Sequence, residues 1–361
     1  MKHRDEFSGD ETRGGSKVFV NYLKRVVEGD KLSSSEAYKV IELLLTEEVA
    51  ENQAAAFFAV LRLRKETGDE LFGFASALLD QALKYDDEDE MEGLLDIVGT
   101  GGDGLGTFNI STAAALVCAT CGVRVAKHGN RAVTSRTGSA DVLEALGVNV
   151  DLHLEEARQI LEEVGITFLF APGFHPAMKH FGAMRRSLGI ATAFNFLGPL
   201  INPFRPSFQV LGVSDRAMIE PMAAALARLG RQRALVVHAH NGMDEISHTG
   251  ITYMAKVDRG QIELTRLERT VQGSDGAGLD GIRGGNAVEN ARILKEVLAG
   301  KPGPAREIVL LNAAAGLMTA GTASDIDEGI FLAAEAIDSG RASMKLDELV
   351  RLTQVNRVRE C

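Results

Sequence analysis

Three kinds of sequence feature are scarce or missing in this chain of 361 residues. No apolar stretch reaches the roughly 18 residues that a membrane-spanning helix needs, and no apolar run near residue 1 resembles the core of a secretory leader. Positive charge is in deficit, since the net charge is −11 at pH 7, whereas a general nucleic-acid binder normally presents a basic face. The sequence therefore favours a globular cytoplasmic protein that binds small ligands locally.

Cysteine is also scarce, with three residues in the whole chain. Cys118 and Cys121 have the Cys-x-x-Cys spacing that occurs in redox motifs. They fall inside an Ala-rich stretch expected to be helical, with no second cysteine pair and no histidine cluster close in sequence. Buried structural thiols are therefore the favoured interpretation, and free thiols suit a reducing compartment.

The first 90 residues carry helical patterns and no visible chemistry. Residues 1–16 are charged and Gly-rich, and we expect them to form a disordered extension. Residues 33–83 predict three helices, the first opened by a capping box of Ser33 and Glu36. The acidic run 86–90 is expected to be a solvated linker. Two apolar stripes look broad for so small a unit, which predicts that part of their surface is buried between subunits. These stripes comprise Ala50, Ala54, Phe57, Phe58, Leu61, Leu71, Phe74 and Leu78.

From Leu94 onward, short apolar runs alternate with helical patterns, which indicates a largely parallel sheet covered by helices. We expect strands at 94–98, 123–126, 166–170, 208–213 and 234–238. Helices are expected at 112–121, 142–146, 154–164, 176–188, 218–229, 287–298, 308–319 and 325–339. Residues 253–257 and 262–265 predict a hairpin that turns at Asp258-Arg259-Gly260.

A glycine-rich loop follows the first expected strand, with glycines at 99, 101, 102, 104 and 106. A strand, a glycine loop and a helix start together place backbone N–H groups around an anion. The Gly-x-Gly-x-x-Gly spacing also matches the dinucleotide fingerprint, but the acidic residue expected about 20 positions onward is missing. The Gly-Lys-Ser/Thr ending of a P-loop is absent. A purely structural glycine turn stays an alternative. Asp103 would repel a phosphate unless a metal lay between them, so the loop suits a metal-bound phosphate.

Polar side chains follow other expected strands, where ligands of such sheets collect. Lys127-His128-Gly129-Asn130-Arg131 is expected to be a loop carrying cationic and amide donors. The hydroxyls that come next are phosphate ligands or helix caps, and they belong to Thr134, Ser135, Thr137 and Ser139.

Asp244-Glu245 and Arg185 are the remaining candidates for substrate chemistry. An adjacent carboxylate pair is often solvated surface, but Mg²⁺ typically uses one or two carboxylates plus substrate phosphates. Arg185 suits a substrate carboxylate, with a surface salt bridge as the alternative. His175, which precedes a proline, can simply cap or pack.

Together these residues resemble the anthranilate phosphoribosyltransferase family, from about residue 18 to residue 350. The matching motifs appear in the family order and are 99–104, 107–112, 127–131, 138–147, 175–179, 194–203 and 244–247. Three departures stand out: Ala191 replaces the usual Arg, Thr134 the usual Ser and Met243 the common Leu. None of them removes a motif residue that has a role below. Pyrimidine nucleoside phosphorylases share the fold type but have a different signature at 127–131. A non-catalytic nucleic-acid binder fits neither the net charge nor the intact Asp244-Glu245 pair.

The resemblance implies transfer of the phosphoribosyl group of phosphoribosyl pyrophosphate (PRPP) to the amine of anthranilate in tryptophan biosynthesis, with Mg²⁺ as cofactor. It implies a nucleoside phosphorylase-type phosphoribosyltransferase fold: a small N-terminal helical domain beside a large α/β domain with a mostly parallel central sheet. We expect the helical domain at 17–90, joined by helices near 176–200, and the α/β domain at 91–361. A homodimer formed through the helical domain is also implied.

Site residues are carried over by motif position. The resemblance implies PRPP contacts from Gly99, Gly102, Asp103, Thr107, Asn109, Ile110, Ser111, Thr112, Lys127, His128, Gly129, Asn130, Arg131, Ala132, Val133, Thr134, Ser135 and Ser139. It implies Mg²⁺ ligands at Ser111, Asp244 and Glu245, and anthranilate contacts from Gly99, Asn130 and Arg185. The amine of anthranilate is nucleophilic when neutral, so no residue is assigned as general acid or base.

Overall fold

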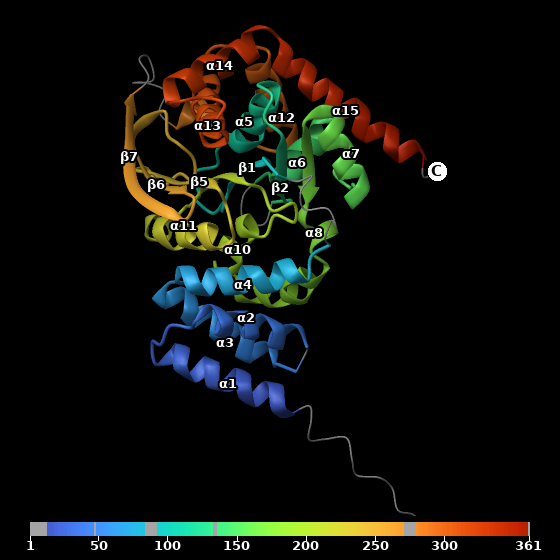
Figure 1. The fold of residues 1–361 in the computed structure, drawn as a ribbon. Coiled ribbons are helices and arrows are strands. Elements are labelled where there is room, and N and C mark those ends of the chain that lie inside the picture. Colours follow the sequence, from blue (N-terminus) through green and yellow to red (C-terminus); the bar gives the residue numbers. More distant parts are fainter. Residues whose placement is uncertain (1–12, 47, 84–91, 133–135, 271–278, 360–361) are drawn as a thin grey trace, which may run out of the picture.

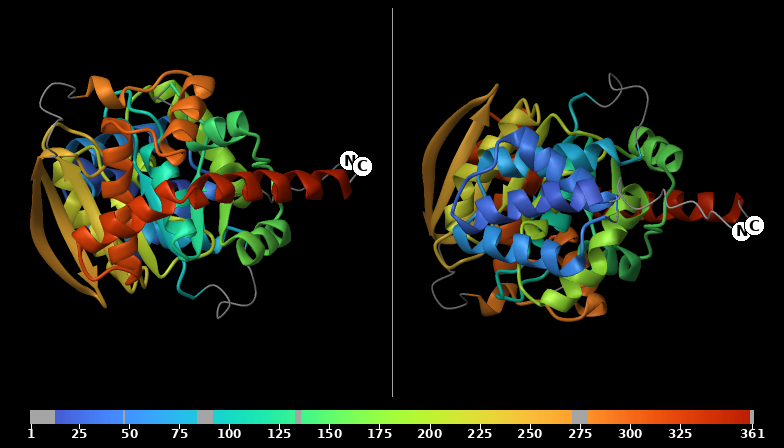
Figure 2. Two further views of the ribbon diagram at one scale, coloured as in Figure 1. Left: turned by 90° about the horizontal axis from the view of Figure 1, so that it is seen from above. Right: turned by 90° about the horizontal axis from the view of Figure 1, so that it is seen from below.

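A helical bundle lies at one end of the molecule, and a twisted sheet flanked by helices forms the other end (Figure 1). The structure, a computed structural model, describes residues 13–46, 48–83, 92–132, 136–270 and 279–359. Seen from below, the bundle lies across the lower side of the α/β part (Figure 2). Within the described residues, no helix is long and apolar enough to cross a membrane.

Four helices, one more than the sequence patterns predict, form the bundle. They are α1 (Arg13–Val27), α2 (Ser34–Leu45), α3 (Glu51–Arg64) and α4 (Gly68–Asp80). The capping box of Ser33 and Glu36 is confirmed at the start of α2. The expectation of a disordered extension at 1–16 is wrong for residues 13–16, which form the start of α1. Residues 1–12 and the expected linker 86–90 lie outside the described residues. α1 is held by Phe19, which is fully buried with its ring 5.4 Å from that of Phe57.

The two apolar stripes of the bundle are largely covered by the chain itself. Phe57, Phe58 and Leu61 of α3 are fully buried, as are Leu71 and Phe74 of α4. They pack in one core with residues of the segment 181–201. The ring of Phe58, for instance, lies 4.7 Å from that of Phe194. These five side chains therefore cannot supply the expected intersubunit surface, because burying them within the chain already removes their apolar area from water, whereas Ala50 of the first stripe stays exposed.

Seven strands form one sheet in the order β3-β2-β1-β4-β5-β6-β7. They are β1 (Leu95–Gly99), β2 (Val125–Gly129), β3 (Ile166–Phe170), β4 (Phe208–Gly212), β5 (Arg233–Ala239), β6 (Thr249–Asp258) and β7 (Gln261–Thr270). The first five are mutually parallel, and β6 and β7 form the expected antiparallel hairpin. Its turn has positive φ at Arg259 and Gly260, as in the two-residue turns that match strand twist.

The chain runs outward from β1 through β2 to β3, and then returns to place β4 on the other side of β1. The strand order therefore reverses between β1 and β4. In open parallel sheets, ligands bind outside the carboxyl ends of the strands at such a reversal. The glycine loop leaves β1 at that place.

Helices cover both faces of the sheet, as the alternating pattern predicts (Figure 1). The remaining helices are α5 (Ile110–Thr120), α6 (Ser139–Leu146), α7 (Leu154–Val164), α8 (Ala171–Phe174), α9 (Gly182–Leu188), α10 (Phe194–Leu200), α11 (Ile219–Arg228), α12 (Ala287–Leu298), α13 (Pro304–Ala320), α14 (Ile326–Asp338) and α15 (Arg341–Arg359), with 3-10 turns at Pro176–Phe181, Arg216–Met218 and Asp280–Ile282. The sequence patterns miss α8, α10 and α15. They place β3 and α7 at the observed bounds.

Cys118 and Cys121 are both free thiols in or next to α5. Cys118 is fully buried, and its Sγ donates to the carbonyl of Ala313 at 3.3 Å. Burial raises the pKa of both thiols, so neither has the thiolate character of a reactive cysteine. The interpretation of this pair as structural thiols agrees with these positions.

Candidate functional site

Asp244 lies directly over the ends of β1 and β4. Gly99 and Gly212 are register partners in these strands. A Cβ on Gly212 would stand 1.5 Å from the Asp244 carbonyl oxygen, and a Cβ on Gly99 would stand 2.4 Å from Asp244 Oδ2. Only glycine leaves room for the Asp244-Glu245 segment at the reversal of strand order. Two stretches about 145 residues apart in sequence therefore meet at the expected ligand position.

The glycine loop bends sharply and turns a backbone donor toward Asp244. Gly101, Gly102, Gly104 and Gly106 all have positive φ, between 66° and 80°, which other residues rarely adopt. The Gly101 N–H donates to Asp244 Oδ2 at 2.7 Å. The loop thus reaches across to the carboxylate pair and is tied to it before any substrate is present.

Three carboxylates of the loop region lie close enough to repel one another. Burial is the main cause of the raised pKa of Asp244, and the nearby Asp103 carboxylate adds to it. Burial and the charge of Asp244 likewise raise the pKa of Glu245, which accepts a hydrogen bond from the Ser111 backbone at the start of α5. Asp103 Oδ2 is buried without a hydrogen-bond partner. Carboxylates that repel one another in this way suit a divalent cation, which removes the repulsion.

These acidic side chains do not by themselves form a cage. Among the residues that the structure describes, no group of three or more His, Cys, Asp or Glu side chains is arranged to hold a metal ion. Mg²⁺ usually takes one or two carboxylates together with water and substrate phosphates. The arrangement around Asp244 and Glu245 therefore fits a cation that arrives with a phosphate ligand.

Lys127 is not on a loop but in β2, as are His128 and Gly129, so the expected loop at 127–131 is wrong in its first three residues. Five backbone pairings between β2 and β3 carry the strand through Gly129. The Lys127 ammonium is buried and donates to the Ile97 carbonyl at 2.5 Å and to Ser111 Oγ at 3.3 Å. Burial lowers its pKa, while the charges of Asp96 and Glu245 oppose that shift. Lys127 thus supports Ser111 from beneath the glycine loop.

The rest of this motif is anchored to α6. The Arg131 guanidinium forms two hydrogen bonds with Glu144, at 2.5 and 2.7 Å, which hold it against α6. Asp141 Oδ2 accepts from the backbone of Ala132 and of Gly138. Asn130 is exposed. The candidate ligands Val133, Thr134 and Ser135 lie outside the described residues.

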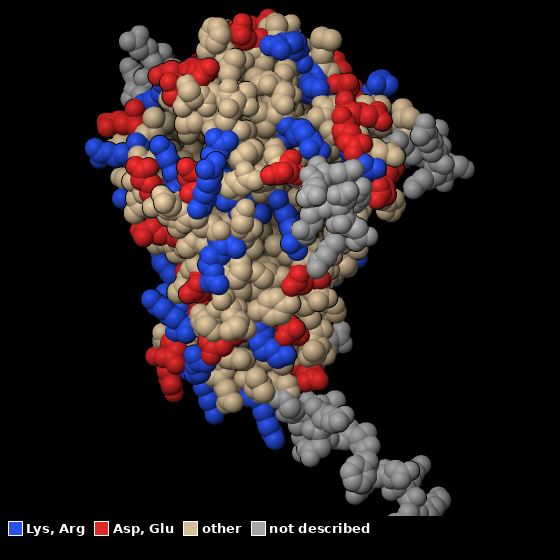
Figure 3. Space-filling model, in the orientation of Figure 1, with Lys and Arg blue, Asp and Glu red and all other residues tan. Residues whose placement is uncertain are grey.

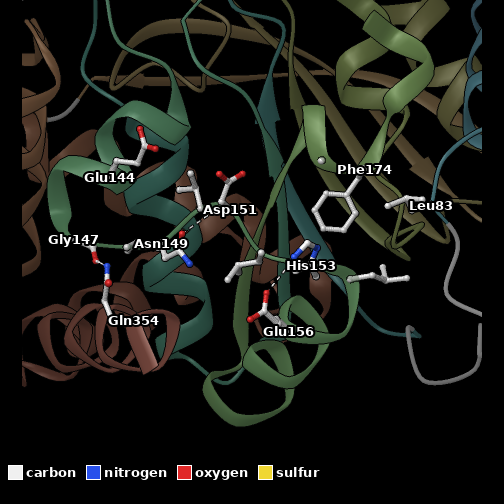
Figure 4. Close-up of a pocket in the computed structure, with 14 residues that line it drawn as sticks. Leu83, Glu144, Gly147, Asn149, Asp151, His153, Glu156, Phe174 and Gln354 are labelled. Atoms are coloured by element: carbon white, nitrogen blue, oxygen red, sulfur yellow. Dashed lines mark hydrogen bonds between the residues drawn. The ribbon is translucent and has the colours of Figure 1, made fainter. Parts of the chain in front are cut away.

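A cavity of about 730 Å³ lies next to Glu144, between α6, α7 and the end of α15 (Figure 4). Glu144 and Glu156 line it, together with residues 147–154, which include Asp151. None of the candidate substrate ligands that the structure describes lines this cavity. The acidic lining does not suit PRPP or anthranilate, so we do not assign substrate to it.

His128 and His175 form a buried pair of rings, 5.2 Å apart and edge to face. The His128 Nδ1 lies 3.2 Å from the Gly198 carbonyl oxygen, which only accepts, so Nδ1 carries the proton. Burial lowers the pKa of His128 to about 3 and that of His175 to about 4. Both rings are therefore neutral at pH 7.

Arg185 sits on α9, half-buried, with its guanidinium 5.5 Å from the centre of the Phe194 ring. Within the described part of the chain it has no carboxylate partner, and burial lowers its pKa. By contrast, Arg62 and Lys65 both pair with Asp215. Among the described residues, no carboxylate therefore neutralises the Arg185 charge, and the alternative of a surface salt bridge finds no support there.

A segment before α12 that the sequence patterns leave unassigned completes the site. Phe108 donates to the carbonyl of Ile282, and Gly284 donates to the carbonyl of Gly106. Residues 282–285 therefore run along the outgoing end of the glycine loop. The available signal in the sequence is the pair Gly284-Gly285 just before a capping box of Asn286 and Glu289.

Basic and acidic side chains are interspersed on the face drawn in Figure 3, and no broad basic surface occurs among its described residues.

Comparisons with known proteins cover nearly the whole chain. Residues 91–343 match the model of the glycosyl transferase family a/b domain, and residues 20–82 match that of its helical bundle domain. The anthranilate phosphoribosyltransferase of Syntrophomonas wolfei is 55% identical over 344 residues, covering 95% of this chain and all of the relative. That of Geobacter sulfurreducens is 47% identical, over 92% of this chain and 98% of the relative.

Solved structures agree in fold. The crystal structure of anthranilate phosphoribosyltransferase from Thermus thermophilus has a TM-score of 0.82 at 40% identity, over 92% of this chain and 99% of that one. The enzyme from Saccharomyces cerevisiae in complex with PRPP and Mg has a TM-score of 0.82 at 28% identity, over 94% and 98% of the two chains. The expected combination of a helical domain and an α/β domain with a mostly parallel sheet is confirmed.

Proposed function

This chain belongs to the anthranilate phosphoribosyltransferase family, and from that premise we propose how its residues carry out the transfer. The protein is an enzyme of tryptophan biosynthesis that transfers the phosphoribosyl group of PRPP to the amine of anthranilate. The products are N-(5-phosphoribosyl)anthranilate and pyrophosphate. The observation that carries the site assignment is the close approach of Asp244 to Gly99 and Gly212 at the reversal of strand order.

PRPP is proposed to lie across the glycine loop and the start of α5. Backbone N–H groups at the positive end of α5 attract its phosphate oxygens. Asn109 precedes α5 and makes no side-chain capping bond to its first turn, so no cap side chain stands between the start of α5 and a ligand. The assigned PRPP contacts are Gly99, Gly102, Asp103, Thr107, 109–112, 127–135 and Ser139. Two of them act indirectly: Lys127 through Ser111, and Arg131 through its anchor on Glu144.

The enzyme uses Mg²⁺, and the residues present fit it. We assign Ser111, Asp244 and Glu245 as the side chains that would hold the cation. Bound there, Mg²⁺ supplies positive charge that stabilises the departing pyrophosphate. The role of the chain is to keep the carboxylates in place, through the Gly101 N–H on Asp244 and the Ser111 N–H on Glu245.

Anthranilate is proposed to lie toward α9, with its carboxylate on Arg185. Because the amine must be neutral to attack C1 of the ribose, the site needs to orient it in line with the leaving group. Asn130 and Gly99 are assigned as its other contacts. His128 and His175 are neutral at pH 7, so they add no cation that would compete with Arg185 for the carboxylate.

Domain limits, assembly and location are part of the proposal. We assign 17–90 with helices near 176–200 to the helical domain and 91–361 to the α/β domain, and the two parts share one core at their boundary. A homodimer through the helical domain is proposed. Exposed apolar side chains on the bundle support it, and they are Val18, Val27 and Leu63. A reducing cytoplasm is the proposed location, consistent with the two free thiols.

The activity is tested by the loss of anthranilate fluorescence on addition of PRPP, with and without Mg²⁺. Fluorescence is expected to fall only when protein, PRPP and Mg²⁺ are all present. Equal loss without PRPP, or none with all components, contradicts the proposal.

A further inference from the structure

A closed ring of four hydrogen bonds joins three segments that are far apart in sequence. Asn290 Nδ2 donates to Asn109 Oδ1 at 3.0 Å. Asn109 Nδ2 donates to the Thr137 carbonyl at 3.3 Å. Thr137 Oγ1 donates to the Gly285 carbonyl at 2.9 Å, and the Gly285 N–H donates to Asn290 Oδ1 at 2.7 Å. The ring thus links the end of the glycine loop, the segment between β2 and α6, and the start of α12.

The ring is buried and tightly fitted. Asn290 is 2% exposed and Thr137 is 8% exposed, so water competes little for their polar atoms. A Cβ on Gly284 would stand 2.7 Å from Asn290 Oδ1 and 2.8 Å from the backbone of Phe108. The segment therefore cannot slide relative to the glycine loop without breaking hydrogen bonds.

Asn109 is the only ring member assigned to PRPP, and both ends of its side-chain amide are held by the ring. The Thr137 hydroxyl proton is committed to Gly285, which removes Thr137 from the hydroxyls that were candidates for a phosphate. Asn290 has both ends of its amide in use. The ring fixes the separation between the glycine loop, which ends at Asn109, and the segment before α6 that contains Thr137.

We propose that Asn290 and Thr137 are positioning residues for PRPP, which fix the distance between the glycine loop and the β2–α6 segment. This inference rests on the proposed function, in which PRPP contacts both loops at once. A substrate with phosphate groups at both ends binds well only when its two sets of donors stand at the matching distance. Holding that distance before binding saves the entropy of ordering the loops.

Thr137→Val keeps the shape of the side chain and removes the hydroxyl that donates to the Gly285 carbonyl, and Thr137→Ser keeps the hydroxyl as the matched control. In Thr137→Val the buried Gly285 carbonyl loses the hydroxyl that donates to it. We therefore expect KM for PRPP to rise by roughly five- to fiftyfold. KM for anthranilate is expected to stay within about twofold, since Arg185 is untouched. Thr137→Ser is expected to restore most of the wild-type KM for PRPP.

Asn290→Asp is the second variant, because it keeps the acceptor for the Gly285 N–H and removes the donor to Asn109. It is expected to raise KM for PRPP as Thr137→Val does. A lower melting temperature with unchanged KM for PRPP in both variants contradicts the proposal. An equal rise of both KM values also contradicts it, since it indicates a general structural role.

Hydrogen exchange of the substrate-free protein separates the ring from the proposed function. Thr137→Val is expected to accelerate amide exchange within 100–109 and 136–139, and not within α7. Unchanged exchange in 100–109 overturns the ring as a positioning device. Absence of PRPP-dependent activity in the wild-type protein overturns the proposed function instead, and the exchange result then still decides whether the ring holds the two segments.

Discussion

Asp244 Oδ2 occupies the space that a side chain on Gly99 would fill, 2.4 Å from the ideal Cβ position. The strand end and the carboxylate are therefore in direct contact, with the Gly101 N–H donating to the same oxygen. The absence of a side chain at position 99 places the acidic segment against the sheet. Gly212, on the neighbouring strand, likewise leaves the space that the backbone of Asp244 occupies.

Gly212→Ala is expected to displace Asp244 and reduce turnover by about two orders of magnitude or more. The added Cβ would stand 1.5 Å from a backbone oxygen, which cannot rotate away as a flexible side chain does. Gly173→Ala is the control, since nothing lies within 4 Å of its Cβ position. Steady-state kinetics at saturating Mg²⁺ measure the effect. Turnover of Gly212→Ala equal to that of the control contradicts the assigned place of Asp244.

Asp244→Asn combined with Glu245→Gln is expected to weaken Mg²⁺ dependence and lower turnover by roughly two orders of magnitude. Because burial and mutual repulsion raise the pKa of both carboxyls, their neutral replacements are expected to increase the melting temperature at pH 8 without metal. The control replaces the exposed acidic pair Glu162 and Glu163 of α7 with glutamines. Full activity of the first double variant at low Mg²⁺ shows that the metal assignment is wrong.

Arg185→Ala is expected to raise KM for anthranilate by roughly one to two orders of magnitude and to leave KM for PRPP nearly unchanged. A charge-assisted pair with a carboxylate is typically worth about 1.5–3 kcal/mol. Arg186→Ala, an exposed neighbour on the same helix, is the control. Kinetics with each substrate varied in turn decide the matter. If both KM values rise together, Arg185 holds structure or phosphate and not anthranilate.

The buried histidines predict a loss of stability in mild acid. His175 takes up a proton near pH 6.5 when unfolded, but only near pH 4 when folded, because burial lowers its pKa. The unfolded state therefore binds more protons below pH 6.5, and the free energy of unfolding falls by about 2 kcal/mol for this residue between pH 7.5 and pH 5. Urea unfolding at several pH values is expected to show a shallower pH dependence for His175→Gln. His180→Gln, which removes an exposed histidine, is the control. An equal slope in all three proteins contradicts the prediction.

The proposed homodimer predicts a mass of about twice the 38.7 kDa of one chain. The reason is no longer the broad stripes, which the bundle largely buries, but the apolar side chains that it leaves exposed. Sedimentation equilibrium at micromolar concentration measures the mass. A monomer over that range contradicts the proposal.

Local patterns in the sequence determine much of this protein. β3 and α7 lie at the bounds that their apolar periodicity predicts, and Arg259-Gly260 forms the expected turn. These features depend on neighbours a few residues away, so the chain encodes them locally. The glycine loop, the carboxylate pair and the motifs that show the family are also readable in order along the chain. The tertiary structure adds α1, whose Phe19 packs against Phe57 of α3.

Only the tertiary structure decides which of these residues meet. Pairing with β3 extends β2 through Lys127. From the sequence Lys127 is expected on a loop, but it is buried in the strand and donates a hydrogen bond to Ser111. Contact between Asp244 and Gly99 bridges more than 140 residues, and the bond from Asn290 to Asn109 bridges 181. No local propensity encodes such distances. They follow from the strand order and from the close packing of the loops at the carboxyl ends of β1 and β4.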